Sequence, residues 1–228
     1  MVLEPKLSLV TGAMNRPTSL ARLIRSIQDQ TTISWELVVS DASDIPVISS
    51  DDRVRILPER PRLGCTKGYN RAFATAQGEW VIWLNDDAEV MPGYADAAIG
   101  FMEAHPEIGL GALHYADPIV GYHVSTCCYG MMYANFGIIR RTLGNQIGWF
   151  DEDLVMYGND NSLAYRVLLA GYGIGEIHNA QIFHHAEDDA LRMANQNGRD
   201  REASILKNKY GPYLVTMRTV YDQALVAQ

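Results

Sequence analysis

The sequence predicts an α/β protein in which helices flank a mostly parallel central sheet. Over the first half of the chain, short apolar runs without polar alternation, typical of strands buried on both faces, alternate with segments of helical periodicity. The strongest run, residues 80–84, ends abruptly in Asn85, Asp86 and Asp87. Because 228 residues suffice for one sizeable core but not for two catalytic domains with a linker, we expect a single domain over residues 1–228.

The first half is predicted to consist of βαβ units. Apolar residues at positions 20, 23, 24 and 27 have the i, i+3, i+4, i+7 spacing of a helix that packs one face on a sheet, and Thr18 is its candidate N-cap. Strands are expected at residues 7–10, 36–40, 54–57, 80–84 and 108–113, and helices at 18–30, 66–76 and from after Gly93 to about Ala104.

The second half has a weaker pattern. Residues 115–133, rich in Gly, Tyr, Cys and Met, are predicted to form loops and short strands. A helix is expected from 158–161 to about Ala170, a short strand at 180–183 that delivers His184 and His185, and a terminal helix at 199–210. Glycines at positions 171, 173 and 175 are expected to end the middle helix and turn the chain.

Composition narrows the classes of partner. Asp and Glu outnumber Lys and Arg by 27 to 19, so the chain lacks the basic character expected of a nucleic-acid-binding protein. The first residues are interrupted by charge and Pro, unlike a signal peptide, and no apolar run approaches ~18 residues. We therefore expect a cytoplasmic protein without a membrane span. Cys65, Cys127 and Cys128 lack metal-ligand spacing and are expected to be buried reduced thiols.

Acidic and imidazole side chains follow several predicted strands. Asp41 ends one strand, Asp86 and Asp87 end another, His184 follows a late strand, and Asp160 lies at the start of a helix. Open α/β sheets bind ligands at the carboxyl ends of their strands, so these groups could converge on one edge. Adjacent carboxylates there are hard oxygen ligands suited to Mn²⁺ or Mg²⁺. Acids after a strand are also common turn residues, which is the competing interpretation.

Four segments, in this order along the chain, carry a family resemblance. They are residues 15–17 (Asn-Arg-Pro) with the strand that ends at 41–43 (Asp-Ala-Ser); residues 63–72 (LGCTKGYNRA) followed by Ala-Gln-Gly-Glu at 76–79; residues 84–93 (LNDDAEVMPG); and residues 148–152 (GWFDE) with 157–166 (YGNDNSLAYR) and 170–172 (AGY). The set resembles the family 2 glycosyltransferases, in particular their rhamnosyltransferase-like members, over residues 7–185. The resemblance implies the GT-A fold, with a nucleotide-binding half at about 1–113 and an acceptor-binding, catalytic half at about 114–228.

By this resemblance the protein is expected to move a sugar from a nucleotide diphosphate donor, a UDP-, dTDP- or GDP-sugar, to a hydroxyl of a glycan or another acceptor. Asp160 matches the general base of inverting members, while Asp87 and His184 match ligands of a divalent metal, Mn²⁺ or Mg²⁺. The residues that would bind the nucleotide sugar are Thr11, Asn15, Arg16, Asp41, Lys67, Asn70, Asn85 and Asp86. Adjacent residues of a strand point to opposite faces, so at most one of His184 and His185 should face the site. His184 is preferred because it follows the pattern small residue, x, apolar, x, His, in which some family members place a metal ligand.

Three positions depart from the family pattern. Ala42 stands where an acid or Gly is usual, Asn85 replaces the first acid of the Asp-x-Asp motif, and Asn159 replaces a Glu before the base. Two alternatives therefore stay open: a catalytically idle sugar-nucleotide or glycan-binding module of the same fold, and a nucleotidyltransferase, although the loop at 12–16 contains a single Gly. Asp160 could also serve only as a helix N-cap, which uses the same residue type.

Overall fold

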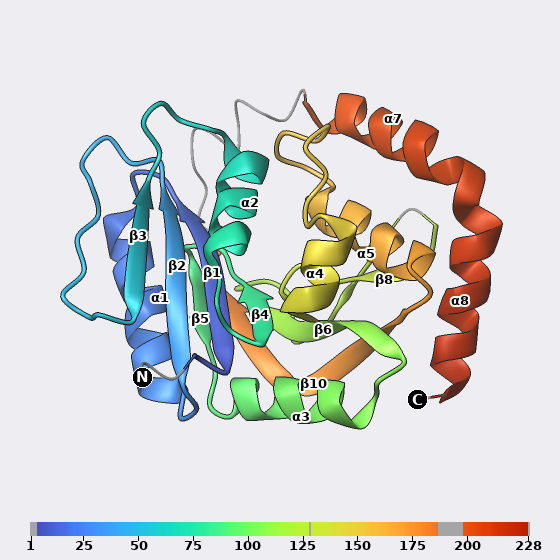
Figure 1. The fold of residues 1–228 in the computed structure, drawn as a ribbon, viewed down its shortest axis with the longest axis horizontal. Helices are drawn as coiled ribbons and strands as arrows, with labels where there is room; N and C mark the ends of the chain where they lie inside the picture. The colour runs from blue at the N-terminus through green and yellow to red at the C-terminus, as the bar shows by residue number, and fades with distance from the viewer. Residues whose placement is uncertain (1–3, 128, 187–197, 228) are drawn as a thin grey trace.

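The computed structural model describes residues 4–127, 129–186 and 198–227 (Figure 1). Its strands are β1 Leu7–Ala13, β2 Trp35–Asp41, β3 Val54–Pro58, β4 Trp80–Trp83, β5 Ala88–Val90, β6 Ile108–Ala116, β7 Ser125–Thr126, β8 Met132–Tyr133, β9 Gly137–Arg140 and β10 Gly173–His184. Its helices are α1 Pro17–Gln30, α2 Cys65–Thr75, α3 Tyr94–Ala104, α4 Arg141–Ile147, α5 Asn159–Leu169, α7 Gly198–Tyr210 and α8 Leu214–Ala227, with a short 3-10 helix, Gly211–Tyr213, between the last two. Within these residues no helix is both long enough and apolar enough to cross a membrane.

Eight strands of the described residues form one sheet in the order β3-β2-β1-β4-β9-β6-β10-β5. Neighbours from β3 to β4 are parallel, as are β6 and β10, whereas β9 is antiparallel to both β4 and β6, and β5 is antiparallel to β10. The predicted α/β fold, a mostly parallel sheet flanked by helices, is confirmed. Because β2 and β4 lie on opposite sides of β1, the strand order reverses there, and open α/β sheets bind ligands at such a point.

Strand β4 lies inside the sheet, which explains the apolar run that precedes the acids. Trp80, Val81, Ile82 and Trp83 are at most 2% exposed. Trp80 and Ile82 join the hydrophobic core on one face of the sheet, while Val81 and Trp83 join the core on the other face. Since side chains on both faces are buried, the strand shows no polar alternation.

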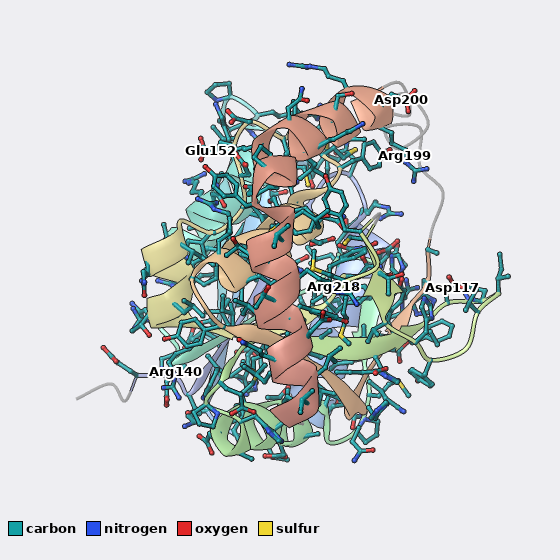
Figure 2. All side chains as sticks on the ribbon, turned by 90° about the vertical axis from the view of Figure 1, so that its right-hand side faces the viewer. Asp117, Arg140, Glu152, Arg199, Asp200 and Arg218 are labelled. Atoms are coloured by element: carbon teal, nitrogen blue, oxygen red, sulfur yellow. The ribbon has the colours of Figure 1, made fainter. Side chains whose placement is uncertain are left out.

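Helices cover both faces of the sheet (Figure 1). Leu23 of α1 and Tyr94 of α3 belong to the core on one face. Phe73 of α2, Leu163 of α5 and Met217 of α8 belong to the core on the other. Figure 2 views the molecule from the side on which α7 and α8 lie, with Arg199 and Asp200 marking the first turn of α7 and Arg218 marking α8.

Two predicted helix caps are wrong. Helix α1 starts at Pro17, with Arg16 at the N-cap position, so Thr18 lies inside the helix. Pro is favoured at the first helical position because its fixed φ suits the helix and its missing N–H is not needed there. Helix α5 starts at Asn159 after Gly158, which takes the N-cap position with a φ of 77°. Asp160 is therefore inside the first turn and does not cap the helix.

The predicted strand at 180–183 is the end of the longer strand β10. This strand begins at Gly173 and contains a bulge between Ile177 and Gln181. Of the glycines expected to turn the chain, Gly171 does so with a φ of 88°, whereas Gly173 and Gly175 lie within the strand. The bulge interrupts the polar and apolar alternation, and only the part after it has a strand pattern in the sequence.

Candidate active site

The acids that follow β4 lie at the carboxyl end of this strand, next to β1. Asp86 and Asp87 are 7% and 3% exposed. The chain then enters β5, which pairs antiparallel with the end of β10 so that Ala88 is opposite His184. This pairing brings His184 beside Asp87 and Asn85, which are far away in sequence.

Five side chains meet at this point. His184 Nε2 lies 3.2 Å from Asp87 Oδ1 and 3.2 Å from Asn85 Nδ2. On the other side of the acids, Arg16 Nη1 lies 2.9 Å from Asp86 Oδ1 and 3.3 Å from Asp87 Oδ2. The guanidinium offsets part of the negative charge that the two buried carboxylates bring together.

His185 takes a different direction from His184. Its backbone N–H donates to the Asp87 carbonyl oxygen at 3.0 Å, while its ring Nε2 lies 3.1 Å from Glu89 Oε2. Adjacent strand residues point to opposite faces, so one imidazole turns to the Asp87 carboxylate and the other away from it. The geometry agrees with the preference for His184, and its role as a metal ligand stays a prediction.

The pair formed by Asp87 and His184 fits a divalent cation. Two donor atoms bound to one ion at about 2.1 Å and at right angles lie about 3 Å apart. The 3.2 Å between His184 Nε2 and Asp87 Oδ1 is close to this value. One carboxylate and one imidazole would fill only two coordination positions of the ion. Mn²⁺ and Mg²⁺ commonly fill the remaining positions with oxygens of phosphates and water.

Asp160, which matches the general base by family resemblance, lies in the first turn of α5. Burial raises the pKa of its carboxyl to about 7, and a weaker polar interaction with the Trp83 side chain acts in the opposite direction. Residue 160 nevertheless keeps part of its surface exposed. A carboxylate that is about half ionised near neutral pH can accept a proton from a hydroxyl group that reaches it.

Cys65, at the start of α2, lies near Asp160 and near Asp86, one of the two acids that follow β4. The surrounding protein raises the pKa of the Cys65 thiol to about 12, chiefly by desolvation and further through the negative charges of neighbours that include Asp160 and Asp86. The two carboxylates therefore act on one thiol. The Cys65 residue as a whole is exposed, so the expectation of a buried residue is wrong there, although the atoms around its sulfur desolvate the thiol. Cys127 is buried. Cys128 lies outside the described residues.

Asp41 and Asn15 shape the loops beside the site. Asp41 is fully buried, and its carboxylate accepts the backbone N–H groups of Ser43 and Val47, both at 3.0 Å. Asn15, whose φ is 57°, donates from Nδ2 to Asp44 Oδ2 and accepts the Asp44 N–H on Oδ1, both at 2.8 Å. Both side chains therefore have a turn-forming role, and their contacts with a nucleotide base stay a prediction.

Three further residues predicted to bind the nucleotide sugar, Thr11, Asn70 and Lys67, make no contact with Asp86 or Asp87 among the described residues. Thr11 is fully buried in β1. The side-chain amide of Asn70 makes two hydrogen bonds with the backbone of Phe150. Its Nδ2 donates to the carbonyl oxygen and its Oδ1 accepts the N–H, each at 3.0 Å. Lys67 is exposed on α2 and makes no hydrogen bond or ion pair within the described part of the chain. Asn70 thus positions a loop, and Lys67 is the residue of the three that is free to reach a ligand.

Sequence reasoning missed two supporting residues on α2. The Tyr69 hydroxyl donates to the Leu84 carbonyl oxygen at 2.7 Å, which fixes the backbone two residues before Asp86. Thr66 Oγ1 accepts from Asn159 Nδ2 at 2.9 Å, next to Asp160. A signal was present, because Thr66, Tyr69 and Asn70 have the i, i+3, i+4 spacing of one helix face.

With this geometry established, the family can be assigned from sequence comparison. The sequence profile of the family described as glycosyl transferase family 2 matches residues 8–149, more than half of the chain. The chain belongs to glycosyl transferase family 2. The predicted resemblance is confirmed.

Curated relatives of this family 2 protein include an N-acetylglucosaminyl-diphospho-decaprenol L-rhamnosyltransferase of Mycobacterium tuberculosis. It is 25% identical over 224 residues, covering 77% of this chain and 70% of its own. A GalNAc(5)-diNAcBac-PP-undecaprenol beta-1,3-glucosyltransferase of Campylobacter jejuni is 33% identical over 98 residues, 39% of this chain and 32% of its own length. An uncharacterized glycosyltransferase of Haemophilus influenzae is matched over 36% of its length, so the chain spans about a third of these last two relatives.

Solved structures with the GT-A fold are also similar. The mannosyltransferase PcManGT from Pyrobaculum calidifontis, in complex with GDP-Man and Mn²⁺, superimposes with a TM-score of 0.65 at 16% identity, covering 99% of this chain and 75% of that one. S. aureus TarS 1-349 in complex with UDP-GlcNAc gives a TM-score of 0.63 at 17% identity, covering 81% of this chain and 59% of that one. At these identities the likeness establishes the GT-A fold.

Proposed function

We propose that this family 2 glycosyltransferase is metal-dependent and inverting, and that it moves a sugar from a nucleotide diphosphate donor to an acceptor hydroxyl. The observation that carries the proposal is the 3.2 Å contact between His184 Nε2 and Asp87 Oδ1 at the carboxyl end of β4. A cation site at this edge of the sheet suits a diphosphate, whose charge the acidic chain would otherwise repel. The complex of PcManGT with GDP-Man and Mn²⁺ supports the proposal through the shared fold.

On the donor side, Asp87 and His184 would hold the divalent ion. When bound, the ion would neutralise negative charge that develops on the departing nucleoside diphosphate. Arg16, now 2.9 Å from Asp86 Oδ1, offers a planar set of N–H donors that suits phosphate oxygens. Asp86 would then be released to contact the ribose or to support the metal.

On the acceptor side, Asp160 would act as the general base. The acceptor oxygen forms a bond to the anomeric carbon, the bond from that carbon to the diphosphate oxygen breaks, and the acceptor proton passes to the Asp160 carboxylate. Because the acceptor attacks from the face opposite to the leaving group, the configuration at the anomeric carbon inverts. A pKa of about 7 supports this role, because the carboxylate is then a stronger base than an ordinary Asp.

Asn159 is the observation that favours the idle-module alternative. Its Nδ2 donates to Thr66 Oγ1 at 2.9 Å, whereas its Oδ1 is buried and lacks a hydrogen-bond partner within the described residues. In family members with a Glu at this position, a second carboxylate would adjoin the base. An idle module would bind a sugar nucleotide at Asp87 and release nothing from it.

Two linked measurements test the proposed function. Thermal shift with UDP-, dTDP- and GDP-sugars and Mn²⁺ should identify a donor, because a ligand at ~100 times its Kd stabilises the fold by about 2.7 kcal/mol. Release of nucleoside diphosphate from that donor, with candidate glycan acceptors, should then be seen for the wild type. Asp160→Asn should keep the thermal shift and lose the release.

Each alternative has its own outcome in these measurements. A thermal shift without release in the wild type would favour the idle module. Release of pyrophosphate from a nucleoside triphosphate would favour a nucleotidyltransferase. Unchanged turnover in Asp160→Asn would exclude this residue as the base.

A further inference from the structure

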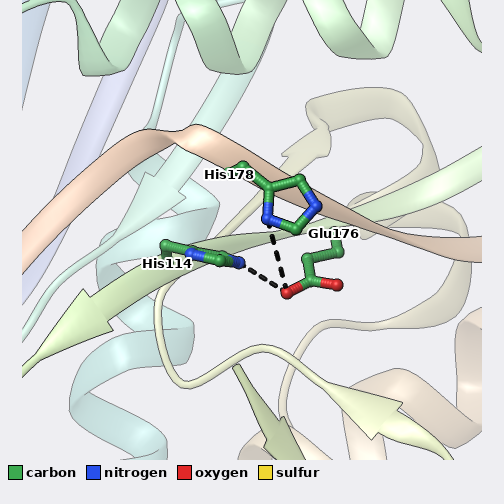
Figure 3. A group of neighbouring side chains, drawn as sticks. All are labelled: His114, Glu176 and His178. Carbon is green, nitrogen blue, oxygen red and sulfur yellow. Dashed lines mark hydrogen bonds and ion pairs between the residues drawn. The ribbon is translucent and has the colours of Figure 1, made fainter. Parts of the chain in front are cut away.

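A group of side chains with metal-ligand atoms lies in the sheet, away from the acids that follow β4. His114 of β6 converges with Glu176 and His178 of β10 (Figure 3). His114 Nε2 lies 2.5 Å from Glu176 Oε1, and His178 Nδ1 lies 3.7 Å from the same oxygen. One ligand atom from each of the three residues lies within 4.8 Å of the others.

The pairing of β6 with β10 explains this convergence. Leu113 is paired with Ile177 in the parallel register, which then shifts so that His114 is paired with Gln181. His178 lies in the irregular stretch of β10 between these two pairs, beside His114. Glu176 precedes His178 by two positions and therefore shares its face of the strand. The β-bulge begins directly after Ile177, and the two imidazole rings meet edge to face with their centroids 4.5 Å apart.

This group is separate from the proposed donor site. Tyr115, the neighbour of His114 in β6, points to the opposite face of the sheet. There its ring centroid lies 6.4 Å from that of His184. The two candidate cation sites thus lie on different faces of β6, and a cation at one does not use a ligand of the other.

The donor set indicates the class of ion. Two imidazole nitrogens and one carboxylate oxygen are typical ligands of Zn²⁺ and of similar transition metals, whereas Mg²⁺ prefers oxygen. In a tetrahedral site with bonds of about 2.0 Å, the donor atoms lie about 3.3 Å apart. The observed 2.5 and 3.7 Å fall on either side of this value.

The three side chains differ in their freedom to adjust. The His114 side chain is 11% exposed, so the strand and its neighbours hold it in place. The His178 side chain is 70% exposed and can turn toward an ion without disturbing the core. The same exposure gives an ion a path from solvent and leaves a fourth position open to water.

We propose that His114, Glu176 and His178 bind a Zn²⁺-class transition metal ion that joins β6 to β10 at the bulge. The ion fixes the part of β10 that leads to His184. Because the three ligands come together only in the folded chain, binding also stabilises the fold.

The test uses the Asp87→Ala variant, in which the proposed donor-site cation is lost and one site per chain remains. Titration calorimetry should give one Zn²⁺ per chain, and Co²⁺ should give the intense visible absorption of a four-coordinate site. Adding His178→Ala should weaken Zn²⁺ binding by at least ~10-fold. Adding Glu176→Gln, which keeps the shape and removes the charge, should do the same.

The matched control is His105→Ala in the same background. His105 Nδ1 lies 3.2 Å from Glu107 Oε1, an ordinary surface pair without a third ligand, so its removal should leave Zn²⁺ affinity unchanged. Far-UV circular dichroism in chelator shows that each variant is folded. Absence of saturable Zn²⁺ binding in Asp87→Ala, or equal affinity with and without His178, overturns the proposal.

Discussion

His184 Nε2 lies 3.2 Å from Asp87 Oδ1 because the short strand β5 pairs with the end of β10. The chain turns into β5 directly after the acids, so the pairing that extends the sheet also places an imidazole beside a buried carboxylate. The residues that follow the central strand β4 are thereby joined to β5, the strand at the edge of the sheet.

His184→Ala should weaken Mn²⁺ binding by at least ~10-fold, because it removes one of two protein ligands. His185→Ala should leave the affinity within about twofold, since its ring meets Glu89 instead. Titration calorimetry with Mn²⁺ and a nucleoside diphosphate measures both variants. Equal losses in the two would show that the choice between the histidines is wrong.

The pH dependence of turnover should report Asp160. Since burial raises the pKa of Asp160 to about 7 and a base must be ionised to act, kcat/KM should fall about tenfold per pH unit below that value and level off above it. A pH profile of donor turnover measures this. A profile that is flat from pH 5 to 8 would contradict the assignment of Asp160 as the base.

The same carboxylate should lower stability at high pH. Its folded-state pKa, about 7, exceeds the ordinary 3.8, so the folded chain binds more protons between these values and stability falls as the pH rises through them. Asp160→Asn removes this loss and should be more stable than the wild type by about 1 kcal/mol at pH 8, a figure reduced for the exposed part of the residue. Thermal unfolding at pH 4 and pH 8 checks this, and the gain should disappear at pH 4.

Much of the nucleotide-binding half could be predicted because its signals are local. The strand that ends in Asp86 and Asp87 and the helix face formed by Leu20, Leu23 and Ile27 follow from spacing alone. The family resemblance added the order of the acids. The cap role considered for Asp160 failed because Gly158 takes that position with a φ of 77°.

Long-range packing explains most of what the sequence did not reveal. The contact of Asn70 with Phe150 and the pairing of β5 with β10 join segments that no local pattern connects. Helix α8 did carry a signal, because its buried residues Met217, Tyr221 and Ala224 have the i, i+4, i+7 spacing of one helix face. Apolar residues that are exposed in the structure, among them Val215 and Val226, obscure the periodicity of that stripe.

Asp151 should matter for stability and not for chemistry. It is 5% exposed and accepts hydrogen bonds from Tyr210 at 2.7 Å and Lys209 at 2.8 Å, which ties the loop before α5 to α7. Asp151→Ala should lower the free energy of unfolding by about 2 kcal/mol, because it leaves the buried Tyr210 hydroxyl without its acceptor. Asp153→Ala removes the exposed partner of the same Lys209 and should change it by less than about 0.5 kcal/mol. Equal effects in urea denaturation would contradict this account.

Two helix glycines should respond in opposite ways to alanine. A Cβ at Gly68 would come within 2.3 Å of Glu59 Oε1, which accepts a hydrogen bond from Ser40 Oγ at 2.6 Å. Gly68→Ala should therefore destabilise the fold by about 1 to 3 kcal/mol. Gly100, exposed on α3 with open space around its Cβ position, should gain about 0.5 to 1 kcal/mol as Ala. Chemical denaturation separates the two, and a stabilising Gly68→Ala would refute the packing argument.

The proposed function depends on Asp87 as the anchor of a divalent cation that binds a nucleotide diphosphate. The most direct measurement is calorimetric titration of UDP, dTDP and GDP with and without Mn²⁺, for the wild type, Asp87→Ala and Asp160→Asn. At least one nucleotide should bind only with Mn²⁺, Asp87→Ala should weaken this binding by ~10-fold or more, and Asp160→Asn should keep it. Unchanged affinity in Asp87→Ala, or no Mn²⁺-dependent binding of any of the three nucleotides, would contradict the proposed function.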